Sequence, residues 1–108
     1  MIARIWHGSV RPEDGDAYFN MLKRTGLKDY QACRGNRGVQ ILRREKAGRT
    51  HFLVLSLWES MESIREFAGP ELERAVYYPE DQKYLLEFEP EVQHYEVLTW
   101  LTQPGVGS

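Results

Sequence analysis

A nearly unbroken apolar run, His51 to Trp58, places the strongest constraint on the fold of this 108-residue chain. It has the length of a strand, and successive side chains of a strand point to opposite faces of the sheet. Phe52 and Val54 then lie on one face, whereas Leu53 and Leu55 lie on the other. Because both faces are apolar, we expect both to be covered in the folded protein.

The rest of the chain alternates strand patterns with helix patterns. Residues 2–10, 38–44 and 91–100 have strand character, and the basic, Gly-containing segment 46–49 predicts a hairpin into the apolar run. Residues 12–24 predict a helix that Gly26 ends. A second helix is predicted after Ser60 as N-cap, over residues 61–68, and a further helical stretch over residues 71–77 that extends toward Leu86.

The order of these elements is strand, helix, strand, strand, helix, strand. This order predicts an α+β, ferredoxin-like βαββαβ fold, with one antiparallel sheet and both helices on one face. The expected spatial order of the strands is fourth, first, third, second. We expect residues 1–102 to form a single domain and residues 103–108 to form a flexible tail without core-forming residues.

The apolar second face predicts a homodimer, because the helices can cover only one face of such a sheet. Charge placement supports this hypothesis: residues 1–50 hold eleven Lys or Arg against five Asp or Glu, and residues 51–108 hold three against eleven. The basic second strand and the acidic fourth strand are expected at opposite edges, too far apart to pair within one chain. Each edge could then meet the opposite edge of a partner. The alternative is that these charges only prevent edge-to-edge aggregation.

Composition argues against several functional classes. The net charge of −2 and the pI near 5.9 argue against a nucleic-acid or membrane-surface binder. The longest apolar run is far shorter than the roughly 20 residues of a membrane span, and the first residues do not resemble a secretory signal. We therefore expect a cytoplasmic protein with no membrane and no nucleic-acid partner.

Histidines are the first candidates for chemistry, and all three lie on predicted strands. His7 and His94 are candidate catalytic bases, because an unperturbed imidazole has a pKa of about 6.5. No two of His7, His51 and His94 have a short metal-ligand spacing, so no metal site is predicted. The alternative is that these histidines are hydrogen-bonded within the sheet and have no catalytic role.

Aromatic side chains are the second signal. They could line a pocket for a small apolar or aromatic ligand, with Tyr77 as a hydrogen-bond donor and the walls formed by Trp6, Trp58, Phe67 and Tyr78. The alternative is that most of these side chains form the core of a two-layer domain. No glycine-rich nucleotide-binding motif is present, so no nucleotide cofactor is predicted from such motifs.

With strands and aromatics placed, the sequence resembles the antibiotic biosynthesis monooxygenase family of the dimeric α+β barrel superfamily. The resemblance covers residues 1–98 and rests on the segments IARIW (2–6), LSLWES (55–60), FAG (67–69), YYPED (77–81) and VQHYEV (92–97). It implies one of two activities: oxidation of polycyclic aromatic molecules by dioxygen without metal or flavin, or degradation of haem. The haem-degrading pattern places Asn on the first strand and Trp and His on the second helical segment. Here those positions hold Trp6-His7, Phe67 and Tyr77, so haem degradation is not expected and no cofactor is predicted.

Two functions from different classes remain open. The first is a cofactor-independent monooxygenase-like protein that deprotonates an electron-rich phenolic substrate, whose carbanion then reacts with dioxygen. In that case His7 or His94 would be the base, Trp6 and Trp58 the walls, and Tyr77 a hydrogen-bond donor. The second is a non-catalytic, ligand-binding or stress-associated dimer, which needs an apolar pocket but no base. The substrate and the pathway cannot be read from the sequence.

Overall fold

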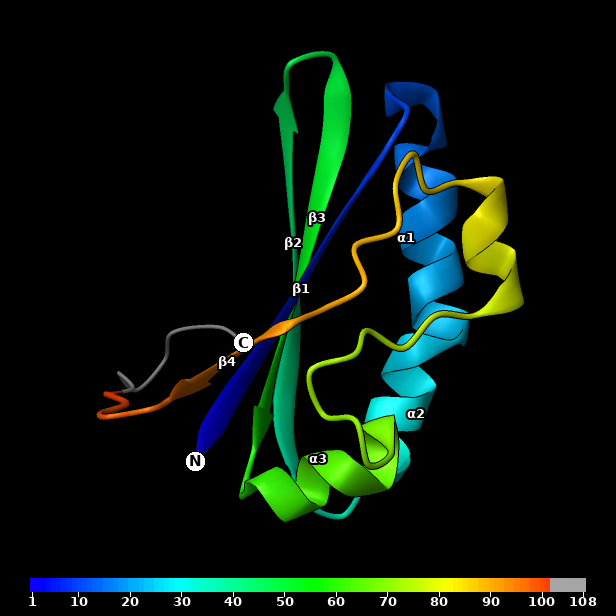
Figure 1. Ribbon diagram of the computed structural model, residues 1–108. Coiled ribbons are helices and arrows are strands. Elements are labelled where there is room, and N and C mark those ends of the chain that lie inside the picture. Colours follow the sequence, from blue (N-terminus) through cyan, green and yellow to red (C-terminus); the bar gives the residue numbers. More distant parts are fainter. Residues whose placement is uncertain (102–108) are drawn as a thin grey trace.

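The computed structural model describes residues 1–101 as a four-stranded antiparallel sheet with helices packed on one face (Figure 1). The strands are β1 (Ile2–Val10), β2 (Asn36–Lys46), β3 (Arg49–Trp58) and β4 (Gln93–Glu96). Their order across the sheet is β2-β3-β1-β4. The helices are α1 (Gly15–Arg24), α2 (Gly26–Ala32) and α3 (Met61–Ala68). This arrangement confirms the predicted ferredoxin-like α+β fold and its strand order. The predicted tail at residues 103–108 and the domain boundary at residue 102 lie outside the described residues.

Local sequence accounts for the best-predicted elements. The β2–β3 hairpin turns on Ala47 and Gly48, both with positive φ (55° and 74°), as in the tight turns whose twist matches that of paired strands. Helix α3 begins after Ser60, whose hydroxyl accepts a hydrogen bond from the backbone N–H of Ser63 at 3.2 Å. It ends at Gly69, which has a φ of 82°.

The first helical region is longer than predicted, and the proposed stop at Gly26 is wrong. A 3-10 turn η1 (Pro12–Asp14) leads into α1, and Gly26 begins α2 instead of ending the helical region. The chain bends at Thr25 between the two helices, with φ and ψ of −110° and −84°. Helix α2 packs against the rest of the protein through Tyr30. The Tyr30 ring stacks on Phe67, with ring centroids 4.6 Å apart, and lies edge-on to Trp58.

The predicted helix over residues 71–86 is not formed. Its backbone instead forms hydrogen bonds with the segment before β4. The N–H of Val92 donates to Glu73 O at 2.8 Å, and the N–H of Ala75 donates to Pro90 O at 3.0 Å. These long-range bonds replace helical bonds, and only the 3-10 helix η2 (Pro79–Lys83) follows. Strand β4 is also shorter than predicted. Its last pairing with β1 is Glu96 with Ile2, and beyond it the N–H of Val97 donates to Met1 O at 2.9 Å.

Both faces of β3 carry apolar side chains, as the sequence predicts, but the described residues bury one face more completely than the other. On the helix side Phe52, Val54, Ser56 and Trp58 are all buried, and they belong to the core together with buried residues of α1, α3 and β1. On the other side no described element covers the sheet (Figure 1). Large apolar side chains are exposed there on three strands, namely Leu42, Leu53 and Tyr95.

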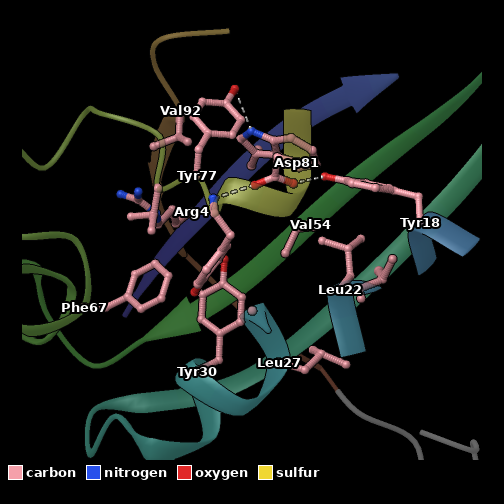
Figure 2. A pocket seen from close by; sticks show the side chains of 15 residues that line it. Arg4, Tyr18, Leu22, Leu27, Tyr30, Val54, Phe67, Tyr77, Asp81 and Val92 are labelled. Atoms are coloured by element: carbon pink, nitrogen blue, oxygen red, sulfur yellow. Dashed lines mark hydrogen bonds between the residues drawn. The ribbon is translucent and has the colours of Figure 1, made fainter. Parts of the chain in front are cut away.

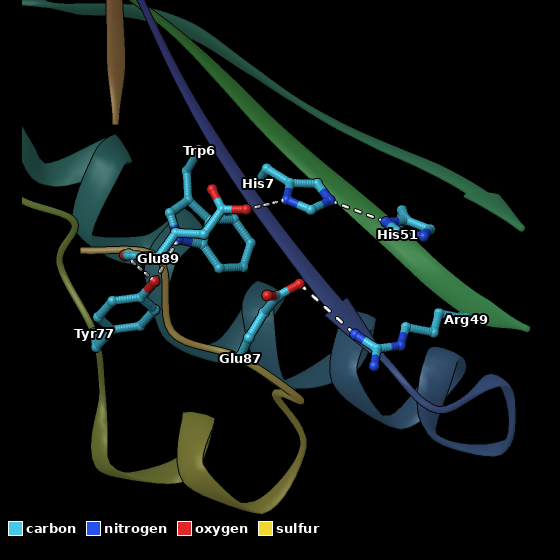
Figure 3. Close-up of polar contacts among 7 residues, drawn as sticks. All are labelled: Trp6, His7, Arg49, His51, Tyr77, Glu87 and Glu89. Atoms are coloured by element: carbon cyan, nitrogen blue, oxygen red, sulfur yellow. Dashed lines mark hydrogen bonds and ion pairs between the residues drawn. The ribbon is translucent and has the colours of Figure 1, made fainter. Parts of the chain in front are cut away.

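The segment between η2 and β4 runs back along the end of β1. Leu85 pairs with Val10, and the N–H of Leu86 donates to Ser9 O at 3.0 Å. This path brings Glu87 to the hairpin, where its carboxylate is 3.7 Å from Arg49 Nη1 (Figure 3). The prediction that the basic and acidic regions are too far apart to pair within one chain is therefore wrong at this point.

Candidate functional site

A cavity lies between the sheet and the layer formed by α1, α2 and the segment around η2 (Figure 2). It contains about 540 Å³ of space not filled by atoms, counting its open mouth, but the centre of a water molecule can occupy only about 40 Å³ of it. One water needs roughly 10–15 Å³ of such space. The free cavity therefore has room for a few waters, and its side chains must move apart to admit an aromatic ring.

Aromatic and apolar side chains form most of the cavity wall. Trp6 comes from β1, Tyr18 and Leu22 from α1, Tyr30 from α2, and Phe67 from α3. Tyr77 and Tyr78 complete the wall from the segment that precedes η2. A concave apolar surface with a small number of polar groups is typical of small-molecule sites.

Asp81 is the buried carboxylate of this cavity, with 3% of its surface exposed. Its Oδ1 accepts a hydrogen bond from the Tyr18 hydroxyl at 2.9 Å, and its Oδ2 accepts one from the backbone N–H of Tyr78 at 2.7 Å. Burial raises the pKa of Asp81, and the two hydrogen bonds oppose that rise. Burial and the carboxylate raise the pKa of Tyr18, so its phenol stays protonated and donates. A carboxylate has about four lone-pair positions, which leaves acceptor capacity for a ligand.

Arg4 is the buried cation of the same cavity, with 2% of its surface exposed. Its guanidinium donates to Leu72 O at 2.6 Å and to Arg74 O at 2.8 Å. A third contact, 3.0 Å long, joins Arg4 Nη1 to Nε2 of His94. Because the guanidinium can only donate, His94 accepts through Nε2 and is neutral. Burial, and then the charge of Arg4, lower the pKa of His94.

Trp6 and Tyr77 meet at the end of the cavity near β1. The indole Nε1–H donates to the Tyr77 hydroxyl at 3.2 Å, and this hydroxyl donates to the backbone carbonyl of Glu89 at 2.5 Å (Figure 3). The Trp6 ring also lies across Gly8, where a Cβ would come within 2.3 Å of it. Tyr78 is tied to α2 by a hydrogen bond from its hydroxyl to the Asp29 carboxylate.

His7 lies on the opposite face of the sheet from Trp6, beside a depression that Leu42, Arg44, His51 and Leu53 help to line. Its Nδ1 is 2.5 Å from Glu89 Oε1, and its Nε2 is 3.0 Å from His51 Nδ1 (Figure 3). His51 Nε2 is 3.2 Å from the carbonyl of Lys46. The Glu89 carboxylate and the Lys46 carbonyl can only accept hydrogen bonds, so His7 donates through Nδ1 and His51 donates through Nε2.

The structure brings together Trp6, Phe67, Tyr77 and Tyr78 of the seven predicted site residues, all of which line the cavity. The other three do not line it. Trp58 is fully buried in the core between the sheet and α3, His94 accepts from Arg4, and His7 lies on the uncovered face.

Sequence reasoning missed Arg4, Tyr18, Tyr30 and Asp81. A signal existed for two of them. Arg4 is a charged residue at an inward position of an apolar strand, and Asp81 follows Tyr78-Pro79 at the spacing of a capping acid.

No His or Cys of residues 1–101 lines this cavity, so a haem iron bound there would have neither of these axial ligands. In the same part of the chain, no group of three His, Cys, Asp or Glu side chains is placed to hold a metal ion. None of the helices described between residues 1 and 101 is long and apolar enough to cross a membrane.

Comparison with known proteins gives similarity at the level of the fold. No protein-family model and no curated protein matches the sequence. A putative antibiotic biosynthesis monooxygenase from Nitrosomonas europaea superposes with a TM-score of 0.61 at 18% identity, over 92% of this chain and 100% of that one. A second, from Bordetella bronchiseptica, gives 0.55 at 23% identity, over 91% and 97%. A mutant of MhuD, crystallised with two manganese protoporphyrin IX molecules per active site, gives 0.61 at 17% identity, over 95% and 100%. The predicted resemblance to antibiotic biosynthesis monooxygenases is thus confirmed for the fold.

Proposed function

We propose that this protein is monooxygenase-like and binds a small aromatic molecule in the cavity between the sheet and the helices. The observation that carries the proposal is a buried carboxylate, Asp81, in a cavity whose walls are mostly aromatic. The fold shared with two putative antibiotic biosynthesis monooxygenases supports the same reaction class. Fold alone does not determine chemistry, so the argument depends on the side chains of the cavity.

Asp81 is the base in this proposal. A general base must reach the substrate with a free lone pair and have a pKa close to the operating pH. Asp81 lines the cavity, and burial raises its pKa in that direction. His94 uses its Nε2 lone pair to accept from Arg4, and His7 lies on the other face of the sheet. Asp81 is therefore better placed than either histidine that the sequence suggested.

The proposed reaction converts an activated methylene between aromatic rings into a carbonyl. Asp81 removes a proton from the methylene carbon, the carbanion forms a C–O bond with dioxygen, and the peroxide anion takes the proton back from Asp81. Loss of water from the resulting hydroperoxide leaves the carbonyl. One oxygen atom enters the product and the other leaves as water, so the methylene supplies all four electrons that dioxygen accepts. The Tyr18 hydroxyl holds the Asp81 carboxylate in place during this sequence.

Oxygen uptake with anthrone tests this function. We expect Asp81→Asn to lower the enzyme-dependent rate by about 100-fold or more, which is the usual contribution of a general base. Glu80→Gln is the matched control, because Glu80 is the preceding acid on η2 and pairs with Arg24 outside the cavity. We expect it to change the rate less than twofold. A wild-type rate equal to the uncatalysed reaction across a panel of anthrones, or equal rates for wild type and Asp81→Asn, would contradict the proposal.

A non-catalytic ligand-binding protein is the second candidate. It is favoured by the bonding of Asp81 itself, because the carboxylate caps η2 and accepts from Tyr18 and therefore also has a structural role. This candidate predicts that wild type and Glu80→Gln bind anthrone equally well, and that neither consumes dioxygen faster than the uncatalysed reaction.

We also propose that the protein is a homodimer that buries the uncovered face of the sheet. The exposed Leu42, Leu53 and Tyr95 on that face support the proposal. Native mass spectrometry of wild type is expected to give a dimer. Leu53→Glu, which places a charge on that face, should give a monomer, whereas Gln31→Glu on exposed α2 should not. A monomeric wild type would exclude this assembly.

A further inference from the structure

We propose that the ligand of the cavity is an anion, namely an aromatic molecule whose carboxylate or phenolate binds the guanidinium of Arg4. This inference deepens the proposed function and rests on it. It gives the aromatic ligand a charge and gives Arg4 a role in selecting that ligand.

Arg4 is a buried cation without a carboxylate partner in the described part of the chain. Among the ion pairs of residues 1–101, none includes Arg4. Its three polar contacts go to neutral groups: the carbonyls of Leu72 and Arg74 and the imidazole of His94. A buried charge is costly unless it is paired and hydrogen-bonded. The site is therefore electrostatically incomplete without an anion.

Arg4 also has donors to spare. A guanidinium carries five N–H groups, and the three contacts of Arg4 use two on Nη1 and one on Nη2. One N–H on Nη2 and the N–H on Nε have no hydrogen-bond partner among the described residues. The Nε–H and an Nη2–H of an arginine can together bind the two oxygens of a carboxylate. Arg4 lines the cavity, so an aromatic ligand that enters when the walls move apart meets this side chain.

Burial disfavours the charge of Arg4, and no ion pair of the described residues neutralises it. Burial lowers the pKa of Arg4, and the nearby Tyr30 and Glu73 oppose this shift. Glu73 is exposed and forms no ion pair with Arg4. The Phe67 ring, 5.8 Å from the Arg4 carbon Cζ, contributes a weak cation–π contact and at the same time forms part of the aromatic wall.

The second buried charge then sets the orientation of the ligand. Arg4 reaches the cavity from β1, whereas Asp81 reaches it from η2 (Figure 2). An anionic group is attracted to Arg4 and repelled by the Asp81 carboxylate. The ligand therefore binds with its charged end at Arg4, which directs its uncharged part toward Asp81, where the proposed proton transfer takes place.

The test compares an anion with a neutral molecule of the same shape. The probes are 2-naphthoate and 2-naphthamide, and calorimetric titration at neutral pH measures the two dissociation constants. We expect wild type to bind the naphthoate at least tenfold more tightly than the naphthamide. Arg4→Gln should remove this preference while leaving naphthamide affinity within about threefold, which also shows that the cavity is still folded. Arg74→Gln is the matched control, because it removes an exposed arginine charge paired with Glu71 near the same segment. It should leave the preference intact.

Arg4→Lys serves as a second variant in case Arg4→Gln does not fold, because it keeps the charge but cannot form a two-pronged bond. It should retain part of the preference. Equal affinity of wild type for both probes would overturn the inference and leave aromatic binding in place. A preference that survives in Arg4→Gln would also overturn it, because the anion would then be bound elsewhere. If neither probe binds at millimolar concentration, the proposed aromatic site fails together with the inference.

Discussion

The bond between Tyr18 and Asp81 is the polar contact in the cavity whose energy can be worked out most directly. The substitution Tyr18→Phe removes one hydroxyl from a fully buried ring and leaves the shape of the core unchanged. The lost bond is 2.9 Å long and ends on a carboxylate with little exposure. Hydrogen bonds to charged groups contribute about 1.5–3 kcal/mol, so we expect the free energy of unfolding to fall by ~2 kcal/mol. For a domain of this size that loss corresponds to a decrease in Tm of roughly 10 °C.

The pH dependence of this loss provides a second test. Burial raises the pKa of Asp81 above its unfolded value, so ionisation of Asp81 destabilises the fold as pH rises from the unfolded pKa to the folded one. The Tyr18 hydroxyl opposes this effect, because it lowers the pKa of Asp81. In Tyr18→Phe, which lacks this hydroxyl, the pKa of Asp81 in the folded state is therefore higher than in wild type. The difference between wild type and Tyr18→Phe should therefore be largest above that pKa, where Asp81 is charged, and should shrink as pH falls through it.

Urea unfolding followed by circular dichroism at several pH values measures both quantities. Tyr84→Phe is the control, because the Tyr84 ring packs 5.8 Å from that of Tyr18 and its hydroxyl has no hydrogen-bond partner in residues 1–101. We expect the control to change stability by less than about 0.5 kcal/mol. A loss equally small for Tyr18→Phe, or a loss that does not vary between pH 4 and pH 8, would refute the assignment of a buried, charged Asp81.

Two further substitutions test the packing around the cavity. In Gly8→Ala the new Cβ would lie 2.3 and 2.6 Å from two atoms of the rigid Trp6 ring, so we expect a displaced indole, a shifted Trp emission and a loss of about 1–3 kcal/mol by urea unfolding. Gly26→Ala, whose Cβ would meet only Tyr30 at 3.8 Å, should cost much less. Ser9 has a buried hydroxyl without a partner in the described residues, so Ser9→Ala should raise stability by up to ~1 kcal/mol. Ser56→Ala should lower it, because the Ser56 hydroxyl accepts from Trp58 Nε1 at 2.8 Å. A loss of stability in Ser9→Ala would reveal an unseen partner, such as a buried water.

The fold could be predicted because it depends on local patterns. The apolar run of β3, the hairpin at Ala47-Gly48 and the capped helix α3 are each encoded within about ten residues of sequence. The segment 71–86 could not be predicted in the same way. It has helical spacing of Leu72, Ala75 and Val76, but its backbone bonds to residues 90–92 instead. Those partners are distant in sequence, and tertiary bonds of this kind override local propensity.

The candidate site shows the same division between local and long-range information. Strand alternation places Trp6 and His7 on opposite faces of β1, so His7 could not share a cavity with the Trp6 ring. His94 is the β4 residue paired with Arg4 and lies on the cavity side of the sheet, but its Nε2 lone pair accepts a hydrogen bond from that arginine. Asp81 has a local signature as a capping acid, yet its buried hydrogen-bond donor Tyr18 is 63 residues away in sequence. The local sequence around Tyr18 or around Asp81 could not predict that contact.

Arg4 is the residue for which strand alternation says most about function. It lies between Ile2 and Trp6 on the inward side of β1, where an apolar side chain would stabilise the core without any cost of burying a charge. The chain instead buries a guanidinium, bonds it to neutral acceptors and leaves two donors free. If Arg4 only fixed the backbone of residues 72–74, a carboxylate beside it would lower the cost of its burial. The absence of such a partner among the described residues is what a site that receives an anionic ligand requires.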